Sequence, residues 1–132
     1  DAPFVILGTA NADQWDGESR PEALEALLAH PKLHDPQPGS LGAVQAADQD
    51  GGVNKRQTGP AAQDTVDWPD APGGPGNLRV DYVLPSADLA VLDAGVFWPA
   101  PEDPMAEIAA RASRHRLVWL DIKMCDGRAD GS

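Results

Sequence analysis

The chain has 132 residues, of which 42% are hydrophobic, and its 21 acidic and 10 basic residues give a formal net charge of -11 at pH 7. The hydrophobic content favours a folded chain, and the length corresponds to one domain or part of one. The negative charge argues against broad affinity for nucleic acid, which needs clustered Lys and Arg, although net charge reports first of all on solubility.

Cys125 is the only cysteine, so an internal disulfide is excluded. No apolar stretch is long enough to cross a bilayer, so we expect no membrane partner, while the compartment stays open, with secreted and periplasmic locations among the alternatives.

The first predicted elements are a strand and a helix. Apolar residues at about 4–7 predict a strand that ends in a turn at Gly8. Ser19 and Glu22 have the spacing of a capping box, and Pro21 suits a first helical turn. The leucines that follow recur at helical spacing, so we expect this helix to pack its apolar face on a sheet.

Residues 32–76 are rich in Pro, Gly, Asp and Gln and predict a long loop insertion, with a short helix at about 41–47. Connections of this length in a compact domain are usually functional or mobile loops. Trp68 in this insertion, like Trp98 further on, either lines a substrate groove or pins its loop onto the layer, and we expect the second.

The last predicted elements are two strands, a helix and a final strand, at about 78–84, 89–97, 104–112 and 116–123. The alternation of strands and helices predicts an α/β layered architecture with a mixed β-sheet and flanking helices. We take residues 1–124 as the folded domain and expect 125–132 to form a disordered tail.

Two polar residues stand at the edges of apolar strands. Asp81 interrupts an otherwise apolar run, and His115 precedes another. A carboxylate and an imidazole so placed can pair, and an Asp that fixes the tautomer of a His prepares a general acid or base. The alternative for Asp81 is a structural carboxylate that caps a turn or pairs with Arg79 or Arg116, and the alternative for His115 is a structural histidine at the end of its strand.

The acidic residues Asp13, Asp16 and Glu18 suggest a cation site. Their spacing fails the calcium-loop pattern, because Asp16 stands where that loop needs glycine. We therefore expect a solvated loop here.

Three short motifs together resemble a known family. In chain order they are Gly8-Thr9-Ala10-Asn11, Arg79-Val80-Asp81-Tyr82 and Ser113-Arg114-His115. This order is similar to the Gly-Asp-x-Asn, Arg-x-Asp-Tyr and Ser-Asp-His motifs in the second half of the endonuclease/exonuclease/phosphatase family, the deoxyribonuclease-like metallophosphoesterases. The resemblance covers about residues 4–123.

The resemblance implies a metal-dependent phosphoester hydrolase. Asn11 would contact the scissile phosphate or its water, Asp81 would orient the histidine, and His115 would be the catalytic imidazole. It also implies a divalent cofactor, Mg²⁺ in the first place with Mn²⁺ or Ca²⁺ as alternatives. The residues that would bind the metal stay unknown. The acidic charge favours a small phosphoester over nucleic acid as the substrate.

By the same resemblance, the chain would form the C-terminal half of a four-layer α/β/β/α fold. We interpret it as a fragment whose N-terminal half would be its partner. The face that receives that half is then expected to be apolar, which also predicts self-association.

Two departures from the family motifs bear on activity. Thr9 stands at an acidic family position and lacks the charge that holds a metal or polarises water, and Arg114 replaces a second carboxylate with a cation that can grip phosphate. We assign both residues to phosphate binding. Three interpretations follow: an active phosphoesterase with an altered metal site, a family member that has lost catalysis and serves as a binding or structural domain, and an unrelated α/β binding module.

Overall fold

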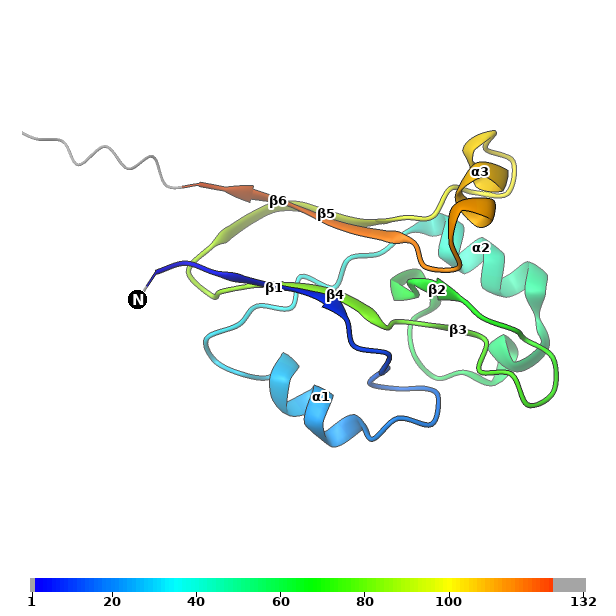
Figure 1. The fold of residues 1–132 in the computed structure, drawn as a ribbon, viewed down its shortest axis with the longest axis horizontal. Helices are drawn as coiled ribbons and strands as arrows, with labels where there is room; N and C mark the ends of the chain where they lie inside the picture. The colour runs from blue at the N-terminus through cyan, green and yellow to red at the C-terminus, as the bar shows by residue number, and fades with distance from the viewer. Residues whose placement is uncertain (1, 125–132) are drawn as a thin grey trace, which may run out of the picture.

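The computed structural model describes residues 2–124 (Figure 1). Its helices and strands follow in the order β1 Val5–Thr9, α1 Pro21–Leu28, α2 Leu41–Asp50, η1 Gly52–Arg56, η2 Ala61–Gln63, β2 Val66–Asp67, β3 Asn77–Leu78, β4 Asp81–Pro85, β5 Ala90–Phe97, α3 Met105–Ala112 and β6 Leu117–Lys123. The mixture of helices and strands confirms the α/β class. The predicted mixed sheet is wrong: the described strands form three two-stranded sheets, β1 with β4, β2 with β3 and β5 with β6, and all three are antiparallel.

The β1–β4 pair carries the N-terminal part of the fold. Its register sets Thr9 opposite Asp81. Tyr82 and Leu84 of β4 are buried with Leu24 of α1, and α1 lies along one side of the strand pair (Figure 1). The predicted packing of this helix on a sheet is confirmed. The predicted capping box is wrong, because the Ser19 hydroxyl donates instead to the Asp13 carbonyl and no side chain caps the helix at Arg20.

The single strand predicted over 78–84 is two strands, β3 and β4, with a break at residues 79–80. At this break, side-chain oxygens accept the backbone amide hydrogen bonds that a neighbouring strand would otherwise accept. The amide of Arg79 donates to Asp13 Oδ2, and those of Val80 and Asp81 donate to Thr65 Oγ1. Because neither acceptor is close in sequence, the periodicity of the segment could not reveal the break.

The strands β5 and β6 pair directly and follow the prediction closely, and α3 lies in the connection between them at one end of the pair (Figure 1). The end of the β5–β6 pair packs on α2 through a core cluster of Ala43, Val96 and Trp98. The approach is so close that a Cβ on Gly42 would lie 1.9 Å from the Trp98 carbonyl oxygen. Trp98 therefore pins its segment onto the layer, as expected.

Residues 32–76 are more ordered than the predicted loop. Helix α2 starts at the predicted position, where Ser40 Oγ accepts the Ala43 amide, but it runs on to Asp50 and is followed by η1, η2 and β2.

The tail predicted at 125–132 lies outside the described residues. Within residues 2–124, no helix is long and apolar enough to span a membrane.

Candidate active site

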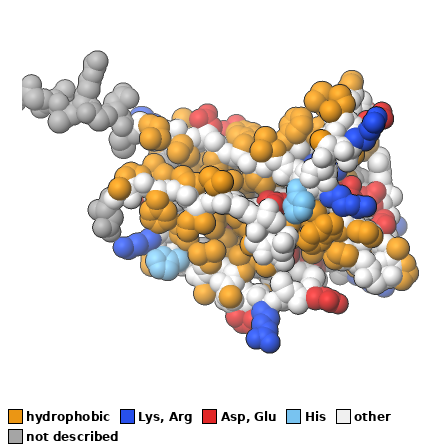
Figure 2. Space-filling model, in the orientation of Figure 1, with side chains coloured by type: hydrophobic (Ala, Val, Ile, Leu, Met, Phe, Trp, Pro, Cys, Tyr) orange, Lys and Arg blue, Asp and Glu red, His pale blue; other side chains and the backbone are white. Residues whose placement is uncertain are grey.

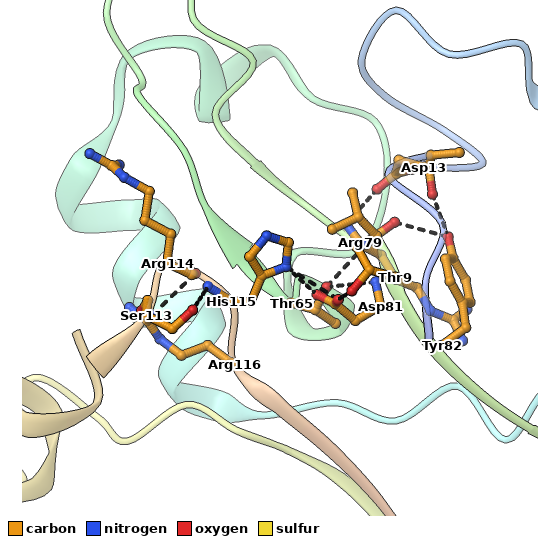
Figure 3. A network of polar contacts seen from close by, with 12 residues as sticks. Thr9, Asp13, Thr65, Arg79, Asp81, Tyr82, Ser113, Arg114, His115 and Arg116 are labelled. Carbon is orange, nitrogen blue, oxygen red and sulfur yellow. Dashed lines mark hydrogen bonds and ion pairs between the residues drawn. The ribbon is translucent and has the colours of Figure 1, made fainter. Parts of the chain in front are cut away.

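The structure joins Asp81 and His115 in a hydrogen-bonded pair (Figure 3). Asp81 begins β4, and His115 precedes β6 and bridges to Val66 of β2. His115 Nδ1 lies 2.9 Å from Asp81 Oδ2 and 3.2 Å from Oδ1. Since an ionised carboxylate can only accept, Nδ1 is the donor and carries a proton. The predicted meeting of these two side chains is therefore present in the structure.

The pair is half enclosed. The Asp81 side chain is 13% exposed and that of His115 is 36% exposed. His115 Nε2 has no hydrogen-bond partner among the described residues. The bond from Nδ1 to Asp81 therefore fixes the tautomer of the ring, and Nε2 remains available for another group. This is the arrangement that general acid or base chemistry requires.

Thr9 is a second hydrogen-bond partner of the Asp81 carboxylate. Its Oγ1 donates to Asp81 Oδ1 at 2.6 Å, across the register that sets the two residues opposite each other. The hydroxyl is neutral and engaged with the carboxylate. An acidic residue at position 9 would put a second negative charge beside Asp81 instead.

The other two predicted site residues lie apart from the pair. Asn11 follows β1 with φ of 52°, a left-handed conformation that Asn tolerates better than most residues, and it lines a neighbouring cavity. Arg114 points away from His115 in Figure 3, and its Nη1 donates to the Asp67 carbonyl at 3.0 Å. The structure thus brings Thr9, Asp81 and His115 together but does not bring Arg114 to them.

A family model, Endonuclease/Exonuclease/phosphatase family, matches residues 1–115, and this match spans the Thr9, Asp81 and His115 site. The chain belongs to the endonuclease/exonuclease/phosphatase family. Neither a curated protein nor a solved structure gives a match. Members of this family are generally metal-dependent phosphoesterases or nucleases, so the family assignment and the site point to the same chemistry.

The predicted alternative partners of Asp81, Arg79 and Arg116, are both paired with other residues. Arg79 forms a two-pronged pair with Asp35, at 2.6 and 2.8 Å. Burial alone would raise the pKa of Asp35, but the hydrogen bonds and positive charge of Arg79, together with the Gln37 amide and the charge of His34, outweigh it and lower the pKa. Arg116 pairs with Asp67 at 3.4 Å and lies over the Trp98 ring. Both arginines are engaged elsewhere, which leaves His115 as the partner of Asp81.

Family members typically use divalent metals, and a divalent metal needs several oxygen or nitrogen donors directed at one point. Between residues 2 and 124, no group of three or more His, Cys, Asp or Glu side chains is arranged to hold a metal ion. At the site, Asp81 is committed to His115 and Thr9, and Thr9 supplies no carboxylate. The described residues therefore do not fit a divalent cation by themselves.

Sequence reasoning missed the role of Asp13, for which a solvated loop was expected. The side chain is buried, and it accepts the amides of Trp15, Asp16 and Arg79 at 2.7, 3.1 and 2.7 Å. It therefore ties the loop after β1 to the break before β4. The contacts with the nearby Trp15 and Asp16 amides are those of an Asx turn and could have been predicted from the sequence. The contact with the distant Arg79 amide could not.

Asp64 was also missed. It is buried, and its Oδ2 has no hydrogen-bond partner among the described residues. Burial raises the pKa of Asp64 to about 8, with further contributions from the charges of Asp13 and Asp16. No sequence pattern marked this carboxyl, because its environment depends on segments far apart in the chain.

Proposed function

We propose that this protein hydrolyses small phosphoesters and that Asp81 and His115 act as its acid–base pair. The observation that carries the proposal is the 2.9 Å contact between Asp81 and His115 Nδ1, which leaves Nε2 open. The family assignment supports the reaction class.

The chain's own residues supply proton transfer and positioning. His115 Nε2 hydrogen-bonds to the phosphoryl group or protonates the leaving oxygen, while Asp81 stabilises the imidazolium that appears when the ring is protonated. Thr9 holds Asp81 in place through Oδ1. Asn11 binds the phosphate or its water from the cavity that it lines.

The metal requirement belongs to this proposal as well. We propose a divalent ion, Mg²⁺ before Mn²⁺ or Ca²⁺, whose ligands lie largely outside the described residues. A divalent ion would neutralise phosphate charge when bound. No step above depends on it.

The substrate is proposed to be a small molecule rather than a nucleic acid. The formal charge of -11 opposes phosphate backbones, and Arg114, assigned to phosphate, points away from the site. Specificity would then come from the loops around the pair.

Thr9 favours a second candidate, a catalytically inactive family member that acts as a binding or structural domain. The two candidates separate in the Thr9→Asp variant, assayed for phosphate release in the protein expressed from its whole reading frame. An impaired enzyme gains activity when the family carboxylate is restored. A domain that has lost catalysis shows none in either form.

We further propose that the described residues are one half of a four-layer α/β/β/α fold. Apolar side chains cover β1 and the β5–β6 hairpin on the face shown in Figure 2. The large exposed ones on these strands are Ile6, Leu7, Leu92, Phe97, Leu117 and Trp119. Patches of this kind mark interfaces, and the proposed occupant is the other half of the family domain. Light scattering tests this: the isolated chain should self-associate, and a monomer that stays monomeric at high concentration would count against it.

A further inference from the structure

A cavity of about 550 Å³ lies beside the acid–base pair. Its volume is typical of small-molecule sites. Asn11, assigned to the phosphate or its water, lines the cavity together with Trp68. The cavity is therefore placed to hold whatever is attached to the phosphate.

Trp68 connects the cavity to the pair. Its ring packs edge-on against the His115 ring, with centroids 5.9 Å apart and planes at 89°. It also packs against the buried cluster of Val66, Leu78 and Val80, which holds the indole in position. A group bound in the cavity thus meets an indole that also touches the catalytic imidazole.

The part of the cavity lining formed by Gln57 and residues 73–75 is held by its own contacts. Gln57 Nε2 donates to the carbonyls of Pro75 and Asn77, and the Asn77 amide donates to Asn54 Oδ1. A Cβ on Gly74 would come within 2.0 Å of the Pro69 carbonyl oxygen, so this turn packs too closely for a side chain. These contacts indicate that the cavity is formed before any ligand binds.

The cavity has a distinctive charge. Arg56 is the one cationic side chain among the described residues that line it, and it is exposed and has no ion-pair partner within residues 2–124. Asp13 and Asp16, which also line the cavity, are occupied by backbone amides. Glu18 is the remaining acidic side chain there and is exposed. The lining therefore carries three carboxylates and one guanidinium, and Arg56 is the one place among these residues where a negatively charged ligand group would meet a cation.

We propose that this cavity binds the alcohol part of the phosphoester and selects a planar group that packs on Trp68 and carries a negative charge at Arg56. The inference rests on the proposed function and names the substrate class of that site. Trp68 and Arg56 are its specificity-determining residues, and both belong to the segment that sequence analysis treated as a loop insertion.

The test measures binding of non-hydrolysable phosphonates by calorimetry, so it does not depend on turnover. Three probes are compared: methylphosphonate, phenylphosphonate and 4-carboxyphenylphosphonate. We expect the phenyl ring to improve affinity up to about tenfold over methyl. The carboxylate should add about two- to fivefold more.

Matched variants assign these gains to residues. Trp68→Ala should remove the phenyl advantage, and Trp68→Phe, which keeps an aromatic ring and protects the fold, should retain most of it. Arg56→Ala should remove only the carboxylate advantage. Lys55→Ala is the control, because Lys55 is the neighbouring exposed cation and does not line the cavity.

The inference is overturned if none of the phosphonates binds, if Trp68→Ala weakens methyl and phenyl probes equally, or if the carboxylate advantage survives Arg56→Ala. Failure of the proposed function looks different. In that case the probes still bind with the expected preferences, but no phosphoester is turned over.

Discussion

Two pairs of a carboxylate and a basic side chain join residues far apart in the chain, and the two pairs differ in their surroundings. Arg79 and Asp35 meet through two hydrogen bonds, with side chains only 9% and 12% exposed. Asp81 and His115 meet through Nδ1 alone, with the histidine 36% exposed. The first pair has its charges matched inside the protein, whereas the second leaves Nε2 without a partner among the described residues, and Trp68, which lines the cavity, packs edge-on against its ring. We infer from this difference that the Arg79–Asp35 pair is structural, and we propose that the Asp81–His115 pair is catalytic because one of its nitrogens remains available to a substrate.

The sharpest way to separate the two pairs is Asp81→Asn. The amide is nearly isosteric, but it can present its NH₂ group to Nδ1 and stabilise the wrong tautomer. We expect phosphoester turnover to fall about 10²- to 10⁴-fold, while the free energy of unfolding changes by less than about 1 kcal/mol. Initial rates and thermal melting measured on one preparation check both parts. A large loss of stability with little loss of rate would make this pair structural.

Asp35→Ala should behave in the opposite way. It leaves the buried Arg79 guanidinium unpaired, which costs about 3 kcal/mol in the free energy of unfolding. Denaturant melts measure this cost. Glu107→Ala is the control, since its pair with Arg111 is 3.7 Å long and highly exposed, so no measurable change is expected. Equal stability of the two variants would contradict the assignment of the Asp35 pair.

Asp64 adds a pH dependence that neither pair explains. Its folded-state pKa of about 8 lies above the unfolded value, so the native state binds the extra proton between roughly pH 4 and pH 8. Stability therefore falls as pH rises through this window, by about 1.4 kcal/mol per pH unit from this group alone.

The variant Asp64→Asn removes this titration. At about 1.4 kcal/mol per pH unit, the stability of the variant relative to the wild type should rise by roughly 3 kcal/mol between pH 5 and pH 7, as measured by denaturant melts at both pH values. A constant difference between the two proteins at all pH values would show that Asp64 does not titrate in this range.

The smallest effect is expected for Thr9→Val. Loss of the 2.6 Å hydrogen bond to Asp81 Oδ1 frees the carboxylate to turn relative to His115. We expect kcat/KM to fall about two- to tenfold, the equivalent of one ordinary hydrogen bond. Thr9→Ser keeps the hydroxyl and should retain activity; if it loses as much as Thr9→Val, the methyl group and not the hydrogen bond is responsible.

Much of the fold was predictable because local patterns decide it. The strands β1, β5 and β6 and the helix α3 lie close to their predicted ranges, and α1 begins at Pro21, which was predicted for its first turn. The pairing of Asp81 with His115 also followed from their positions at strand edges. Each of these features depends on residues close in sequence or on a simple rule about strand ends.

The remaining features depend on long-range contacts. Asp13 and Thr65 end the ladder at residues 79–80 from positions 66 and 15 residues away, so the periodicity of that segment could not show the break. The position of Trp68 against His115 likewise depends on how β2 meets the start of β6.

The most direct test is hydrolysis of a phosphodiester and a phosphomonoester by the protein expressed from its whole reading frame, with Mg²⁺, Mn²⁺ or Ca²⁺ and with chelator. The same assay is run on His115→Ala. We predict turnover that chelator removes and that His115→Ala loses. Turnover that survives in His115→Ala would contradict the mechanism, and no turnover with any metal would make a non-catalytic binding domain the better account.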